Sequence, residues 1–189
     1  MNIQIGIQGS RGSTTERACK FFTEQRSIIH YEIRYLISTE NVLKALHKHE
    51  IDYGVFAWES SRAGLVQETQ EAIKKYMFTI IAEHDFQIDH ALLTNAQIDK
   101  SRMVYVYSHP QALKEHYNFL ISAFTKVEFV DEVDTALAAK RLSENKYPKN
   151  SLVIAPIGCS KIYDLDVYHD NLPSNQGYFT KIYFVKKGL

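Results

Sequence analysis

Apolar strand patterns and amphipathic helix patterns alternate along almost the whole chain, and this alternation is the strongest constraint on its fold. Ile3, Ile5 and Ile7 alternate with polar residues, which is typical of a strand with one buried face. Residues 51–58 form a nearly continuous apolar run, as expected for a parallel strand buried on both faces. The alternation predicts an α/β fold in which helices cover both faces of mostly parallel sheets.

Further strands and helices are predicted along the rest of the chain. Strands are predicted at residues 31–37, 78–88, 103–107, 127–130, 152–155 and 179–187, and helices at 39–46, 65–76, 108–120 and 135–142. Another helix follows the first strand, where Ser13 and Glu16 have capping-box spacing. Small ligands in such folds bind beyond the carboxyl ends of strands, which points to the loops at residues 9–15, 58–64 and 108–111.

Charge and cysteine content argue against several classes of function. Lys plus Arg and Asp plus Glu both total 22, so no net charge attracts nucleic acid or an acidic membrane. Cys19 and Cys159 lie far apart, and the histidines show no helical pair with a nearby acid, so we expect buried free thiols and no metal. Residues 1–6 carry no leader pattern and no apolar run is long enough to cross a bilayer, which predicts a cytoplasmic protein.

Three loops and one strand carry polar residues that could bind a ligand. Residues 9–15 combine glycines and hydroxyls with a helix start, whose N–H groups can bind an anion. Judged by spacing alone, ordinary structure explains each of them equally well or better. Residues 9–15 can be a turn followed by a helix cap, and residues 58–64 a solvated connection. Ser108 can be a helix cap, and Thr180 can be present because threonine readily forms strands. Alternation sends the side chains of Thr180 and Lys181 to opposite faces of the last strand.

Taken in order, these segments resemble the catalytic domain of prephenate dehydratases. The family's GPxGTxS loop is matched at Gly9, Gly12, Ser13 and Thr15, and its DYGVVPIENSxxG segment is similar to residues 52–64, DYGVFAWESSRAG. Residues 106–113, VYSHPQAL, are identical to a common form of the family's most recognisable stretch, and residues 134–139 are similar to its STAxAA segment. Asn175 to Val185 stands in the place of the family's terminal NxTRFxVI segment and keeps its threonine as Thr180.

The resemblance implies a two-lobed fold like that of type II periplasmic binding proteins, with a substrate cleft between the lobes. The chain would cross the hinge twice, so residues 1–77 and 166–189 are expected in lobe 1 and residues 78–165 in lobe 2. The regulatory ACT domain that often follows in this family is not expected after Leu189, and neither is phenylalanine feedback through such a domain. Family members commonly form dimers or tetramers, which makes a homo-oligomer compatible with the resemblance.

The implied activity is that of a lyase without a cofactor, which converts the dicarboxylate prephenate to phenylpyruvate in phenylalanine biosynthesis, a branch of aromatic amino acid biosynthesis. A threonine without an activating neighbour is too weak an acid to protonate a substrate at neutral pH. Thr180 is therefore expected to donate a hydrogen bond to the leaving hydroxyl in the transition state. The expected substrate-binding residues are Ser13, Thr15, Glu59, Ser61, Gly64, Ser108, Gln111 and Lys181.

The sequence departs from the family pattern where chemistry is expected. Ser10 replaces a proline, Ser60 an asparagine and Glu115 a glutamine. Lys181 and Ile182 stand where the family has Arg–Phe, and lysine lacks the planar fork with which arginine holds a carboxylate at two points. Two alternatives stay open: a prephenate decarboxylase of the antibiotic-pathway type, which protonates the ring instead, and a non-catalytic protein that binds small anions.

Overall fold

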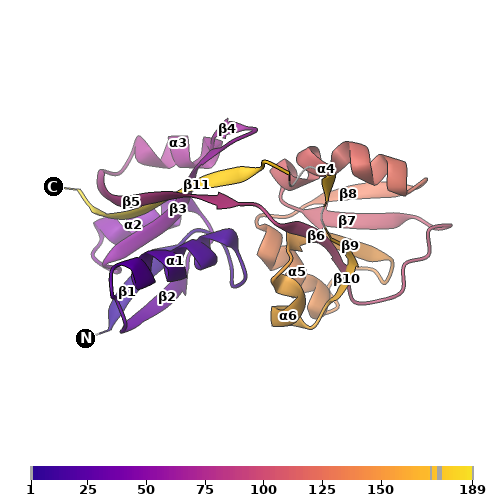
Figure 1. The fold of residues 1–189 in the computed structure, drawn as a ribbon, viewed down its shortest axis with the longest axis horizontal. Helices are drawn as coiled ribbons and strands as arrows, with labels where there is room; N and C mark the ends of the chain where they lie inside the picture. The colour runs from indigo at the N-terminus through magenta and orange to yellow at the C-terminus, as the bar shows by residue number, and fades with distance from the viewer. Residues whose placement is uncertain (1, 171, 174–175, 189) are drawn as a thin grey trace. The chain divides into compact units, whose positions relative to one another are not determined.

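The computed structural model describes residues 2–170, 172–173 and 176–188 and divides into two compact units (Figure 1). Unit 1 comprises Met1–Gln87 and Tyr178–Leu189, and unit 2 comprises Ile88–Gly177. Asn175, at the start of the predicted terminal segment, lies outside the described residues.

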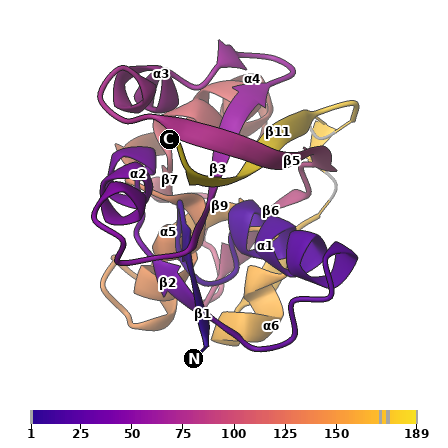
Figure 2. The ribbon, with the colours of Figure 1, turned by 90° about the vertical axis from the view of Figure 1, so that its left-hand side faces the viewer.

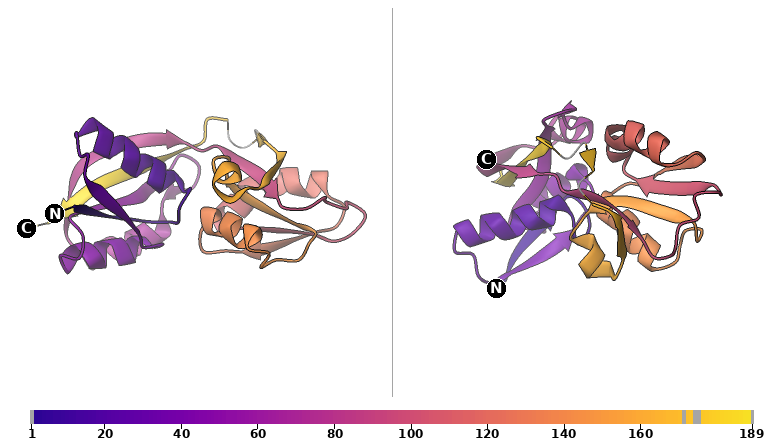
Figure 3. Two further views of the ribbon diagram at one scale, coloured as in Figure 1. Left: turned by 90° about the horizontal axis from the view of Figure 1, so that it is seen from below. Right: turned by 45° about the vertical axis from the view of Figure 1, so that its right-hand side comes forward.

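In the part of unit 1 that the structure describes, one mixed sheet is accompanied by three α-helices. Its elements are β1 (Ile3–Ile7), α1 (Thr14–Gln25), β2 (Tyr31–Tyr35), α2 (Thr39–His47), β3 (Tyr53–Ser60), β4 (Gly64–Leu65), α3 (Gln67–Ile73), β5 (Phe78–Gln87) and β11 (Phe179–Lys187). The strand order is β2-β1-β3-β11-β5, with β4 paired to β3. β1 is parallel to β2 and β3, whereas β11 is antiparallel to both of its neighbours, and Figure 3 shows it alongside β5.

Helices cover both faces of this sheet. Ala18, Cys19 and Phe22 of α1 pack on one face, which we call the α1 face, together with Ile182 and Phe184 of β11. On the other face, α2 and α3 pack against the alternate β11 residues Tyr183 and Val185. Figure 2 shows α1 and α2 on opposite sides of the sheet. The two-residue alternation of β11 therefore decides which side chains share the face with α1.

The described residues of unit 2 form a second mixed sheet and three α-helices. Its elements are β6 (His90–Thr94), β7 (Val104–Ser108), α4 (Pro110–Ala123), β8 (Val127–Asp131), α5 (Thr135–Ser143), β9 (Ser151–Pro156), α6 (Cys159–Tyr163) and β10 (Asp166–His169). The strand order is β10-β6-β9-β7-β8. β7 is parallel to β8 and β9, while β6 is antiparallel to β9 and β10. α4 covers one face, and α5 and α6 cover the other.

The α/β class is confirmed, but the prediction of mostly parallel sheets was wrong, since each sheet is mixed. The chain passes between the two units at residues 87/88 and 177/178, rather than at the expected 77/78 and 165/166. β5 stays in unit 1 because it pairs with β11 from Phe78 to Gln87, and β10 stays in unit 2 because it pairs with β6. The predicted strand at residues 78–88 is followed by a separate strand, β6, which was not predicted. Among the described residues, no helix is long and apolar enough to cross a bilayer.

Candidate active site

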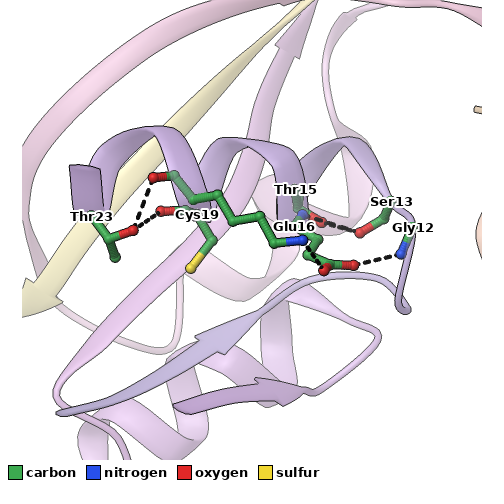
Figure 4. Close-up of polar contacts among 7 residues, drawn as sticks. Gly12, Ser13, Thr15, Glu16, Cys19 and Thr23 are labelled. Atoms are coloured by element: carbon green, nitrogen blue, oxygen red, sulfur yellow. Dashed lines mark hydrogen bonds and ion pairs between the residues drawn. The ribbon is translucent and has the colours of Figure 1, made fainter. Parts of the chain in front are cut away.

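Ser13 caps the N-terminus of α1, as its spacing to Glu16 predicted. Its hydroxyl accepts the Glu16 N–H at 3.2 Å. The Glu16 carboxylate accepts the Gly12 N–H at 2.5 Å and contacts the Lys20 ammonium at 2.6 Å (Figure 4). In a standard capping box this carboxylate binds the N–H of the cap residue itself. Here the Ser13 N–H already donates to the Ser10 carbonyl at 3.1 Å, so the carboxylate binds one residue earlier.

The hydroxyl protons of Ser13 and Thr15 are both used within the loop. Thr15 donates to the Gln8 carbonyl, so the 2.8 Å bond between the two hydroxyls must use the proton of Ser13. Neither side chain keeps a proton for a ligand. The first N–H groups of a helix have no partner inside it, and no residue in the described part of the chain accepts from Thr14 or Thr15 N–H. The donors that this loop offers to an anion are therefore backbone groups.

Ser10, which replaces the family's proline, lies in the same loop and is 6% exposed. Within the described residues its hydroxyl has no hydrogen-bond partner, although its carbonyl accepts the Ser13 N–H. A buried hydroxyl without a partner is costly, since it has lost its hydrogen bonds to water. It therefore adds hydrogen-bonding capacity to the loop before α1.

The turn between β3 and β4 contacts the start of β11. Ser61 donates its N–H to the Phe179 carbonyl at 3.0 Å, and its hydroxyl accepts the Phe179 N–H at 3.1 Å. Gly64 pairs with Ser60 and has a φ of +71°, in the left-handed region that glycine adopts readily. Ser60 therefore lies between Gly64 of β4 and Thr180 of β11, and the predicted Ser61 binds the residue directly before Thr180.

Thr180 lies at the start of β11, half-buried, and on the α1 face. It is paired with Phe86 of β5, and directly paired residues share a face. Phe86 belongs to the apolar cluster that α1 covers, as does Ile182, two residues after Thr180. Within the described part of the chain, the Thr180 hydroxyl has no hydrogen-bond partner. A hydroxyl with an unused proton therefore lies on the face that carries the α1 helix.

Lys181 and Glu59 lie on the other face. They are paired with each other, and the Lys181 ammonium is 4.0 Å from the Glu83 carboxylate. Burial and then the nearby Glu83 and Glu59 carboxylates raise the pKa of Tyr183, which belongs to the cluster under α2. The opposite orientation of Thr180 and Lys181 is as predicted, and it separates the charge of Lys181 from the group around Thr180.

Ser108 and Gln111 belong to unit 2. Ser108 ends β7, has no exposed surface, and donates its hydroxyl to the Ile154 carbonyl at 2.8 Å. The prediction that Ser108 caps the following helix was wrong: the cap is His109, whose side chain accepts the Gln111 N–H at 3.2 Å. Capping needs a residue outside the strand ladder, and Ser108 still pairs with Asp131. The Gln111 amide donates to Glu115 at 2.6 Å.

Sequence reasoning missed a polar network beside the first loop. The Thr39 and Thr69 hydroxyls lie 2.9 Å apart, and Thr69 donates to the Ala57 carbonyl at 2.7 Å. The Glu68 carboxylate accepts the Thr39 N–H at 2.5 Å, at the N-terminus of α2. Gln8 accepts the Ala57 N–H at 2.8 Å. A threonine before an amphipathic segment is a signal for a helix start, but its distant carboxylate partner leaves no local pattern.

The ionisable groups give no sign of thiolate or metal chemistry in the part of the chain that the structure describes. Burial raises the pKa of the Cys19 thiol to about 12, so the thiol is protonated at neutral pH. Cys159 is also buried, so the prediction of two buried free thiols is confirmed. No group of three or more His, Cys, Asp or Glu side chains among the described residues could hold a metal ion.

Comparison with known proteins gives a family match over nearly the whole chain. A family model described as prephenate dehydratase matches residues 5–188. A bifunctional chorismate mutase/prephenate dehydratase from Buchnera aphidicola is 27% identical over 179 residues, which cover 95% of this chain and 46% of that protein. The chain therefore spans about half the length of this relative.

Solved structures show the same fold. A prephenate dehydratase from Arthrobacter aurescens, solved in complex with L-Phe, has a TM-score of 0.82 at 19% identity. The match covers 99% of this chain and 60% of that protein. A periplasmic substrate-binding protein of an ABC transporter from Coxiella burnetii has a TM-score of 0.55 at 14% identity. This match covers 97% of this chain and 84% of that protein. The predicted likeness to periplasmic binding proteins is confirmed at the level of fold.

Proposed function

This chain belongs to the prephenate dehydratase family, and we propose that it catalyses the decarboxylative dehydration of prephenate to phenylpyruvate. The observation that carries the proposal is the Thr180 hydroxyl, half-buried on the α1 face and without a hydrogen-bond partner among the described residues. It supplies the one donor that this reaction needs at the departing oxygen.

The reaction requires little covalent chemistry from the protein. The bond between the ring and its carboxylate breaks, and carbon dioxide leaves. The electron pair of that bond moves into the ring, the carbon–oxygen bond to the hydroxyl breaks, and the ring becomes aromatic. The departing oxygen gains negative charge, leaves as hydroxide and takes up a proton from the solvent to become water. A hydrogen bond from Thr180 to this oxygen, stronger in the transition state than in the ground state, lowers the barrier.

The substrate carries two carboxylates, and the start of α1 suits one of them. The Thr14 and Thr15 N–H groups are backbone donors at the positive end of a 12-residue helix, which favours an anion. The Ser13 and Thr15 hydroxyls hold the loop in shape rather than donate to the substrate. Ser108, Gln111 and Lys181 remain predicted substrate contacts, and Glu59 remains predicted to orient its neighbours.

The cellular setting is also a proposal. We infer that the protein acts in phenylalanine biosynthesis and works in the cytoplasm, an assignment supported by its two free buried thiols. The substrate is the small molecule prephenate, and a homo-oligomer is compatible with the family.

The direct test is to incubate the purified protein with prephenate and identify the product. We expect phenylpyruvate, which is recognised by its ultraviolet spectrum in alkali and by mass spectrometry. A non-aromatic keto acid would instead identify a prephenate decarboxylase, and unchanged prephenate would indicate a protein that only binds small anions. The matched control is Thr180→Val, which keeps the size and shape of the side chain and removes its hydroxyl.

A further inference from the structure

The turn between β3 and β4 contacts Phe179, the first residue of β11, and the preceding Tyr178 in three ways. Ser61 donates its N–H to the Phe179 carbonyl at 3.0 Å. The Ser61 hydroxyl accepts the Phe179 N–H at 3.1 Å. The Arg62 guanidinium lies over the Tyr178 ring, 5.2 Å from its centroid. Ser61 thus binds both the N–H and the carbonyl of Phe179, the residue directly before Thr180.

The turn that carries Ser61 is itself well fixed. The buried Ser60 hydroxyl lies 3.3 Å from both the Arg62 N–H and the Ala63 N–H and accepts from them. Gly64 then returns the chain into β4 and pairs with Ser60. A turn with its own internal hydrogen bonds transmits its position to whatever it binds.

Thr180 lacks such support of its own. Its hydroxyl has no partner in the described part of the chain, so its position depends on the backbone on either side. The ladder from β11 to β5 is regular from Phe179 to Phe184, whereas the ladder to β3 shifts register between Lys181 and Ile182. On the β3 side, the bonds from Ser61 to Phe179 therefore hold the backbone directly before Thr180, where the ladder is short.

We propose that Ser61 is a positioning residue for Thr180. The Ser61 hydroxyl fixes the position of the Phe179 N–H, and thereby the position of the Thr180 hydroxyl that donates to the departing oxygen. This inference rests on the proposed function and revises the predicted role of Ser61 as a substrate-binding residue. A donor misplaced by a fraction of an ångström loses much of its effect in the transition state, while the binding of the substrate carboxylates is unaffected.

The test compares three serine variants in steady-state kinetics with prephenate. Ser61→Ala removes the acceptor and should lower kcat roughly tenfold with KM changed less than about twofold. Ser61→Thr keeps the acceptor hydroxyl and should restore kcat to within about threefold of the wild type. Ser38→Ala is the matched control, because Ser38 in unit 1 also accepts one backbone N–H at 3.1 Å, from Asn41, and should leave kcat unchanged.

A double variant separates positioning from general weakening of the fold. If Ser61 acts through Thr180, Ser61→Ala should cause less than a twofold further loss of kcat when Thr180 is already valine. A full additional tenfold loss, an effect confined to KM, or wild-type kcat in Ser61→Ala would each overturn the proposal. An additional tenfold loss of kcat in the double variant would mean that Ser61 acts independently of Thr180. An effect confined to KM would mean that Ser61 binds the substrate.

The same experiment distinguishes the failure of this inference from the failure of the proposed function. If the wild-type protein converts no prephenate, the proposed function is wrong, and the role of Ser61 through Thr180 is wrong with it. If the wild type is active and the two substitutions are additive, only the positioning role fails.

Discussion

The two units place polar groups near the ends of their strands in different ways. In unit 2, the Ser108 hydroxyl is committed to Ile154, and the Glu132 carboxylate is bound by Arg141 and Tyr147, each at 2.5 Å. In unit 1, the Thr180 hydroxyl and the Thr14 and Thr15 N–H groups have no partner among the described residues. The Ser108 and Glu132 side chains thus stabilise unit 2, whereas unit 1 leaves the Thr180 hydroxyl and two helix N–H groups available.

This difference shows where reactivity is expected. A polar group that is already satisfied by its own unit gains little from a ligand, because it must first break an existing bond. A group held in place with its hydrogen-bonding capacity unused can act on a substrate without that cost. Substitution of Thr180 should therefore change turnover, and substitution of Glu132 should change stability.

The largest effect is expected from Thr180→Val, which removes the unused hydroxyl and preserves shape. Loss of one transition-state donor should lower kcat on the order of 100-fold, with a smaller change in KM. Steady-state assays of phenylpyruvate formation measure both constants. A loss under threefold would remove the catalytic role from Thr180.

The next largest effect concerns the stability of unit 2. Burial opposes ionisation of Glu132, but the bonds from Arg141 and Tyr147 outweigh it and lower the pKa of the carboxyl. Glu132→Gln removes the charge that both donors bind and should lower the free energy of unfolding by about 2 kcal/mol. Urea unfolding followed by circular dichroism measures the loss.

The matched control for that change is Glu144→Gln, because Glu144 pairs with Lys146 at an exposed site and should have no measurable effect. Fluorescence of Trp58, the single tryptophan and part of unit 1, reports on the other unit in the same samples. Equal effects of the two substitutions would contradict the structural role of Glu132.

A smaller effect is expected from pH. His90 and His116 lie 3.2 Å apart in unit 2, and burial, then the neighbouring His116 and His109, lower the pKa of His90 to about 3. The unfolded chain takes up this proton below the ordinary histidine value of 6.5, whereas the folded unit does so only near 3, so acid favours unfolding. The stability that His90 contributes is thus present above pH 6.5 and is lost as pH falls towards 3.

Comparison with His90→Asn isolates this contribution from that of the carboxylates. Between pH 6 and 4 the wild type should lose stability faster than the variant, by on the order of 1 kcal/mol per pH unit. Hydrogen exchange of unit 2 amides at each pH provides the measurement. Parallel pH profiles would show that His90 is not the group responsible.

The smallest effect is expected from Lys181→Ala. Lys181 follows Thr180 directly but lies on the other face of the sheet, near Glu83. We expect kcat to change less than threefold, which makes this variant the closest neighbour control for Thr180→Val. A rise in KM would support the predicted binding of a substrate carboxylate by Lys181, whereas a tenfold loss of kcat would contradict its position away from the reacting atoms.

Local patterns were enough to predict the parts of unit 1 that depend on near neighbours. The cap at Ser13, the alternation of Ile3 to Ile7 and the opposite faces of Thr180 and Lys181 follow from spacings of a few residues. The family resemblance added the choice of Thr180, which no spacing could supply.

Other features depend on partners that are distant in sequence. The insertion of β11 between β3 and β5 makes the sheet mixed, and no pattern within residues 179–187 specifies those neighbours. Ser108 looked like a cap because it precedes Pro110, but its pairing with Asp131 keeps it in the strand. The hydrogen bonds that use the hydroxyl protons of Ser13 and Thr15 also depend on the Gln8 carbonyl, which lies close to Thr15 only in the folded loop.

The position of β11 has a consequence for synthesis on the ribosome. Unit 2 is continuous in sequence and can fold as soon as Gly177 has emerged, whereas the sheet of unit 1 lacks its fourth strand until residues 179–187 have been made. Until then Val55 and Phe56 of β3 have an unpaired strand edge beside them. The unit translated first is therefore the last to be completed, and the strand that completes it also delivers Thr180.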